Sequence, residues 1–142
     1  MLRCAIVIAA PLLVIATAGA VTIARNGKAA ATIVVKKDAP RVPDFAAQEL
    51  ATYLGQICDG QFQVVEADDD APQPVTDLVD TDNAILVGES AYTAEFAEEI
   101  AQLPPGGYAI ISRPGLLVIA GHDDVRTNPG AARSLGDAGS LY

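Results

Sequence analysis

The chain has 142 residues, a formal net charge of −9, 51% hydrophobic residues, two cysteines and no tryptophan. This length fits one domain and is too short for a (β/α)8 barrel, which needs roughly 250 residues. The acidic balance argues against nucleic-acid binding, which relies on a basic patch to neutralise phosphates.

The first twenty residues have the three parts of a secretory signal peptide. Arg3 gives a basic start, the run Cys4–Ala16 is apolar, and Ala18-Gly19-Ala20 is a small-x-small cleavage site. We therefore expect residues 1–20 to be removed and residues 21–142 to form a secreted or periplasmic domain. An uncleaved membrane anchor is the alternative, because the uncharged stretch from Cys4 is about long enough to cross a bilayer.

An Asn-Gly dipeptide predicts a hairpin at the start of the mature domain. Asn26-Gly27 suits the two positive-φ positions of a type I′ turn. The alternating segment 21–25 precedes this dipeptide, and the β-branched segment 30–36 follows it. We expect the two segments to pair as antiparallel strands.

The segment 43–58 predicts an amphipathic helix. Pro43 suits the first turn, where its missing N–H costs no hydrogen bond, and Gly60 suits the left-handed position after the last turn. Cys58 is the one cysteine left after cleavage, so we expect no disulfide and a structural side chain at the helix end. The expected core-facing stripe has helical spacing and consists of Ala46, Leu50, Tyr53, Leu54 and Ile57.

Four further strands and a second helix are expected in the rest of the chain. The strands are residues 61–66, 84–87, 108–112 and 116–120. Arg113-Pro114-Gly115 joins the last two strands into a hairpin, and the helix covers residues 92–103. Polar loops rich in Gly, Pro and Asp fill residues 67–81 and 122–140.

This order of elements predicts an α+β fold of two layers. We expect a mixed sheet of about six strands with the helices packed on one face. Because the second helix is short, valine and isoleucine side chains should be exposed on one face of the sheet. Such a patch favours association.

Four sequence blocks follow one another in the order of a known accessory domain. Phe45–Leu54 looks like the helical motif A-A-x-E-L-x-x-Y-L, and Ile85–Ser90 looks like the strand motif I-x-V-G. Gly107–Ile110 looks like D-G-Y/F-x-I, and Leu116–Gly121 looks like L-x-I-x-G. Together they resemble the N-terminal domain of family 67 glycoside hydrolases, the α-glucuronidases, and a related domain that precedes the barrel of bacterial β-N-acetylhexosaminidases.

The resemblance implies a non-catalytic accessory domain of a secreted hydrolase that acts on a polysaccharide such as xylan. The family's catalytic carboxylates lie in the barrel, so no position of this chain inherits a catalytic role. Gly139-Ser140-Leu141-Tyr142 matches the opening of the family's next helix, and we expect a truncation before that helix and the barrel. Gly106 departs from the family's Asp, and the loop after His122 is longer than in the family.

Two acidic segments carry the oxygen ligands that calcium prefers. They are Asp68-Asp69-Asp70 and the segment from Asp80 to Asn83. Neither has the Gly and Glu spacing of an EF-hand loop, so we expect solvated loops. His122-Asp123-Asp124 contains the one histidine of the chain, which we expect to be a loop residue rather than an acid–base or metal site.

Two other patterns suggest chemistry without meeting its requirements. Glu89-Ser90 is not a nucleophile elbow, because Tyr92 stands where glycine is needed. Tyr53 and Tyr108 are aromatic residues of the kind that stack on sugar rings, but their positions in a helix stripe and a strand favour the core.

We therefore expect no catalytic residue, no cofactor and no metal in this chain, and no catalysis from it alone. The expected partner is a catalytic barrel domain, with polysaccharide as a second candidate and no stable membrane span after cleavage. Two alternatives stay open. One is a free-standing carbohydrate-binding module, which needs exposed aromatic residues, and the other is an envelope protein held by an uncleaved signal segment.

Overall fold

The computed structural model describes residues 20–122 as a five-stranded sheet, a small hairpin and four helical segments. The hairpin strands are β1 (Ala24–Arg25) and β2 (Lys28–Ala29). The sheet strands are β3 (Ala31–Lys36), β4 (Val64–Ala67), β5 (Asn83–Val87), β6 (Tyr108–Arg113) and β7 (Leu116–Gly121). The helical segments are α1 (Arg41–Cys58), α2 (Val75–Leu78), the 3-10 helix η1 (Ala91–Phe96) and α3 (Ala97–Ala101). The predictions for the signal peptide and for residues 139–142 lie outside the described residues, apart from Ala20.

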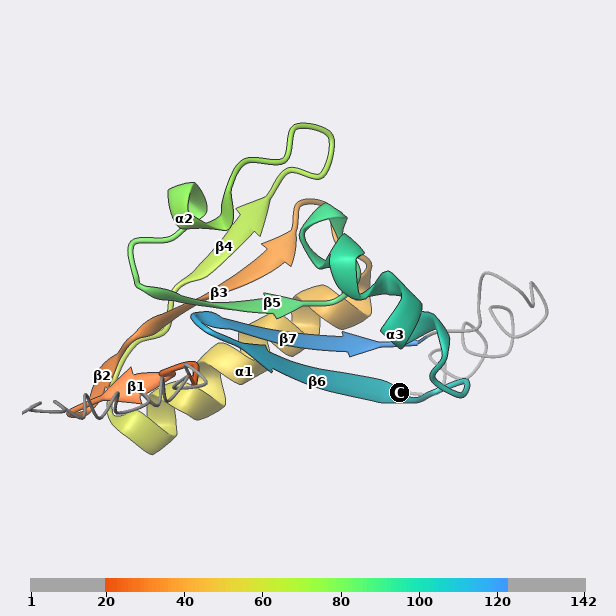
Figure 1. Cartoon of the computed structure of the whole chain (residues 1–142). Helices are drawn as coiled ribbons and strands as arrows, with labels where there is room; N and C mark the ends of the chain where they lie inside the picture. Colours follow the sequence, from red (N-terminus) through yellow and green to blue (C-terminus); the bar gives the residue numbers. More distant parts are fainter. Residues whose placement is uncertain (1–19, 123–142) are drawn as a thin grey trace, which may run out of the picture.

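The strand order of the sheet is β4-β3-β5-β7-β6 (Figure 1). The first four strands in this order are parallel, and β6 pairs antiparallel with β7 along its whole length. The α+β class and the mixed sheet are therefore confirmed. The sheet has five strands instead of about six, because the first hairpin forms a separate two-stranded unit.

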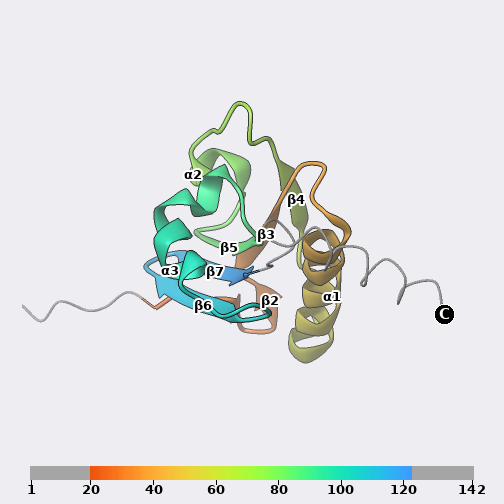
Figure 2. The ribbon, with the colours of Figure 1, turned by 90° about the vertical axis from the view of Figure 1, so that its right-hand side faces the viewer.

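Helices lie on both faces of the sheet, which corrects the two-layer arrangement predicted from the sequence. Every residue from Ala31 to Val35 is buried, so β3 is covered on both sides, as is typical of a central parallel strand. Ile33 and Ile85 pack with Ala47 of α1, whereas Val34 and Leu86 pack with Phe96 and its neighbours on the other face. Figure 2 shows α1 on one side of the sheet and α2 and α3 on the other.

The first hairpin forms at the predicted dipeptide but with a different second strand. Asn26 and Gly27 have φ values of 53° and 72°, as the type I′ turn requires. The partner of β1 is Lys28–Ala29, whereas the segment from Ala31 pairs with β4 and β5. The prediction of one long strand over residues 30–36 in the hairpin was wrong, because this largely apolar segment is buried on both faces as an inner strand of the sheet.

The long helix is rotated relative to its predicted orientation. The side of α1 that faces the sheet carries buried Ala47 and half-buried Leu50, Leu54 and Cys58. Ala46 is exposed, and Tyr53 and Ile57 are 58% and 78% exposed, so the prediction of these three residues as core-facing was wrong. The predicted stripe and the observed stripe share Leu50 and Leu54. The side that carries Ala47 faces the sheet because this small residue lets the helix approach closely.

The end of α1 also differs from the prediction. Asp59, with φ 51°, takes the left-handed position that was expected for Gly60. Gly60 is needed for a different reason, because a Cβ there would lie 3.3 Å from the carbonyl oxygen of Gly27. The helix end therefore rests directly on the turn of the first hairpin.

The predicted second helix, residues 92–103, is a 3-10 helix followed by a single α-helical turn. Ser90 begins it, and its backbone N–H donates to Thr93 Oγ1 at 2.8 Å. The helix ends at Ala101, before Pro104. The loop expected at residues 67–81 contains the short helix α2, which follows Pro74.

Gly88, which directly follows β5, should tolerate no side chain. Its φ is +83°, and a Cβ there would lie 2.9 Å from the Cβ of Pro43 in α1. We expect Gly88→Ala to lower the free energy of unfolding by about 2–4 kcal/mol, since the left-handed backbone and the overpacking both add. Gly106, with φ +74° and nothing within 4 Å of its Cβ position, is the matched control. In urea unfolding, Gly106→Ala should lose only the smaller free energy that the left-handed backbone costs. Equal losses of unfolding free energy in Gly88→Ala and Gly106→Ala would contradict the close packing of α1 against β5.

Candidate functional surface

The carboxyl ends of the parallel strands, where α/β sheets commonly bind ligands, are held together by local bonds. Lys36 Nζ lies 2.8 Å from Asp69 Oδ2, and Asp69 Oδ1 accepts a hydrogen bond from the Ala91 N–H at 3.0 Å. Asp68 Oδ1 accepts from the Asp70 N–H at 2.9 Å. These carboxylates therefore fasten the loop after β4 to β3 and to the start of η1.

Tyr92 strengthens the same loop. Its hydroxyl donates to the carbonyl oxygen of Asp68 and accepts from the N–H of Gln73, both at 3.2 Å. Within residues 20–122, no three His, Cys, Asp or Glu side chains are grouped so that they could hold a metal ion. The acidic loop therefore has a structural role at the edge of the sheet.

The second acidic segment is also engaged in structure. Asn83 Oδ1 accepts from the Thr22 N–H at 3.1 Å, and its Nδ2 donates to the Ala30 carbonyl at 3.0 Å. Thr81 Oγ1 donates to the carbonyl of Asn83 at 2.7 Å. Asp80 and Asp82 are exposed beside these contacts. The segment thus joins the first described residues to β3 and β5.

The remaining candidate residues do not converge on one site. His122 is half-buried at the end of β7, and its backbone N–H donates to the Gly107 carbonyl at 2.9 Å. Its predicted companions Asp123 and Asp124 lie outside the described residues. Glu89 is exposed, and Ser90 begins η1.

The main surface feature is apolar and lies on the α1 side of the sheet. The paired residues Ile110 of β6 and Ile119 of β7 point to the same side, and Ile119 packs in the core cluster beneath α1. Because α1 packs on β3, β4 and β5, the β6 end of this side has no helix over it among the described elements. We call this surface the open apolar face; it comprises Tyr108 and Ile110 of β6 and the side of α1 that carries Tyr53 and Ile57. Val42 and Phe45 are also exposed, near the start of α1.

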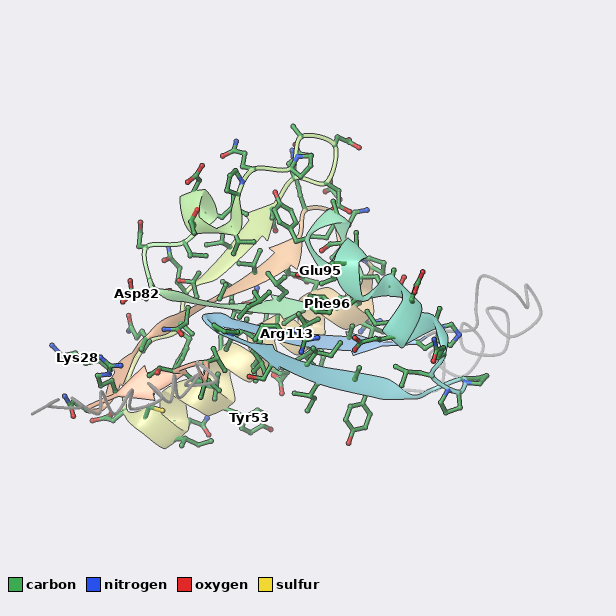
Figure 3. All side chains as sticks on the ribbon, in the orientation of Figure 1. Lys28, Tyr53, Asp82, Glu95, Phe96 and Arg113 are labelled. Atoms are coloured by element: carbon green, nitrogen blue, oxygen red, sulfur yellow. The ribbon has the colours of Figure 1, made fainter. Side chains whose placement is uncertain are left out.

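Both tyrosines that were expected in the core are part of this face. Tyr108 is 72% exposed at the start of the edge strand, and Tyr53 is 58% exposed on α1. In Figure 3, Tyr53 points downward from α1, the direction in which the sheet ends at β6. The sequence signal for this surface is a second helical stripe, Val42, Ala46, Tyr53 and Ile57, beside the one that α1 buries.

The opposite side of β6 is well covered. Ile111 is buried with Phe96 and Ile100, and the guanidinium of Arg113 lies 5.5 Å from the centre of the Phe96 ring. Arg113 Nη2 lies 3.8 Å from Glu99 Oε1, although both side chains are largely exposed. Figure 3 shows Arg113 beside Phe96, so the edge strand is fixed from one side and open on the other.

No family model matches the chain, and no curated protein matches it. The four sequence blocks therefore carry the resemblance to the glycoside hydrolase domain by themselves. Of the helices in the described part of the chain, none has the length and apolar character that a membrane crossing requires.

Proposed function

We propose that the chain is the non-catalytic N-terminal accessory domain of a secreted carbohydrate-active hydrolase of the α-glucuronidase type. The observation that carries the proposal is the open apolar face. Exposed apolar side chains on one side of a domain are typical of a protein-interaction site, and in an accessory domain they would pack against the catalytic domain.

The placement of the four blocks supports the proposal. Phe45–Leu54 lies within α1, and Leu116–Gly121 is β7 from end to end. The glycine that ends the I-x-V-G block is Gly88, whose φ of +83° and contact with Pro43 exclude larger residues. The blocks therefore coincide with elements and with a glycine that the geometry requires.

An activity assay tests the non-catalytic part of the proposal. The purified full chain should give no turnover of aryl glucuronides or aryl N-acetylhexosaminides above buffer, because hydrolysis needs two carboxylates facing each other across a sugar. Turnover that follows the chain through purification and disappears on heat unfolding would contradict the proposal.

A free-standing carbohydrate-binding module is the second candidate, favoured by the exposure of Tyr53 and Tyr108. An aromatic ring on the surface offers a flat apolar platform to a sugar. Saturable binding of the full chain to xylan, lost in Tyr108→Ala and kept in Tyr92→Phe, would favour this candidate. Absence of such binding would leave the accessory domain as the better account.

A further inference from the structure

The two edges of the sheet are protected very differently. β4 has four residues, exposes Glu66 and leads into the acidic loop at Asp68. β6 has six residues, and its one charged residue is Arg113 at the end of the strand. It contains no proline and pairs regularly with β7 throughout. An edge strand with no charge, proline or bulge along most of its length is a template for pairing with another strand.

The hydrogen bonds of β6 show which of its residues face outward. Gly107 accepts from the His122 N–H, so Gly107 faces the neighbouring chain segment. In an antiparallel pair this orientation alternates, so Ala109, Ile111 and Arg113 face β7. Tyr108, Ile110 and Ser112 therefore turn their N–H and C=O groups away from the sheet. In the described part of the chain, the one protein partner of these six groups is Arg113 Nη1, which donates to the Ser112 carbonyl at 3.1 Å.

We propose that two copies of the chain form a two-fold symmetric dimer by antiparallel pairing of β6 with β6. A two-fold axis at Ile110 places this residue opposite itself and Tyr108 opposite Ser112 of the second copy. All three outward residues then bond through both groups, which makes six backbone hydrogen bonds. If the register of the two strands shifted by one residue, outward-facing backbone groups of one copy would lie opposite inward-facing groups of the other. A shift of two residues would leave some outward N–H and C=O groups unpaired.

Symmetry and charge favour a second copy over an unrelated extended peptide. The outward residues are centred on Ile110, so the edge is complementary to itself, as an isologous interface requires. In a chain of net charge −9, the outward-facing residues Tyr108, Ile110 and Ser112 carry no charge. The two copies of Arg113, at the end of β6, would lie at opposite ends of the new pair. Like-charge repulsion at β4, with Glu66 and the acidic loop, disfavours the same pairing there.

The dimer should be concentration-dependent. A single strand pair is a small interface, below the roughly 1,200 Å² that stable complexes bury. Sedimentation equilibrium of the full chain over a hundredfold range of concentration should show a reversible monomer–dimer equilibrium. A monomer across the whole range would overturn the proposal.

Two variants separate pairing through β6 from association through α1. Ile110→Pro removes an outward N–H and no bond to β7, so it should raise the dissociation constant at least tenfold while the circular dichroism spectrum stays unchanged. Ile57→Lys, at an exposed site on α1, should leave the dissociation constant within twofold. Association that is lost in Ile57→Lys and kept in Ile110→Pro would place the interface on α1 and overturn the proposal.

A cross-link keeps the proposal testable even if Ile110→Pro unfolds the chain. Directly opposite residues in a bonded antiparallel pair have Cα atoms about 5.5 Å apart, which is within disulfide range. In a chain with Cys4→Ser and Cys58→Ser, Ile110→Cys should form a covalent dimer under mild oxidation. Ile57→Cys in the same background is the control; equal cross-linking of the two variants would contradict the assigned register.

Discussion

Replacing Ile85 or Leu86 by alanine should lower the free energy of unfolding by about 2–5 kcal/mol in each case. The two residues are neighbours in β5 and are 0% and 2% exposed. Ile85 packs in the cluster beneath α1, and Leu86 packs in the cluster beneath η1 and α3. Because consecutive strand residues point to opposite faces, each substitution opens a cavity in a different layer.

Urea unfolding measures both losses. Ile57→Ala is the control, since Ile57 is 78% exposed, and its change should stay within about 0.5 kcal/mol. The three-layer arrangement requires large effects at both positions of β5. A large effect at Ile85 and a negligible one at Leu86 would mean that only the α1 face of the sheet is covered.

A negative charge on the open apolar face should prevent the proposed docking to a catalytic barrel. Tyr53→Asp and Ile57→Asp each place a carboxylate on the exposed stripe of α1. Removing an apolar anchor from the centre of an interface costs about 2 kcal/mol or more, which is roughly thirtyfold in affinity. The matched control is Gln48→Asp, which adds the same charge on the exposed polar side of the same helix.

Both outcomes of this comparison are informative. The proposed packing requires weak binding by Tyr53→Asp and Ile57→Asp and near-normal binding by Gln48→Asp. Equal losses in all three variants would assign the effect to net charge rather than to the apolar surface. Unfolding midpoints of the variants should match that of the wild type, because all three sites are exposed.

Local signals in the sequence predicted most individual elements well. The Asn26-Gly27 turn, the strand that ends at Gly88 and the Arg113-Pro114-Gly115 connection all lie where turn residues and apolar runs place them. These features depend on residues close together in the chain. Their conformations are therefore visible before any tertiary contact is known.

The two-sided burial of the sheet was harder to predict. A run such as that of β3 is equally consistent with a hairpin strand and with a central parallel strand. η1 and α3 are short helices, and their sequence gave little indication that they cover one face of the sheet. They cover it through Phe96 and Ile100. Long-range packing decides which strands become neighbours, and the local sequence pattern does not contain this information.

The exposed tyrosines show the same limit for the functional surface. Helical spacing allowed two stripes on α1 that share Leu50 and Leu54. The choice between them depends on how closely the helix approaches the sheet, and Ala47 decides it by being small and fully buried. Tyr53 consequently belongs to the surface of the domain, where it supports a role in interaction.

The most direct test of the proposed function is titration calorimetry of the full chain against the barrel of a family 67 α-glucuronidase expressed without its own N-terminal domain. We predict saturable binding that weakens at least tenfold in Ile57→Asp and keeps its affinity in Gln48→Asp. Absence of binding at concentrations where the chain is folded, or binding that Ile57→Asp leaves unchanged, would contradict docking through the open apolar face.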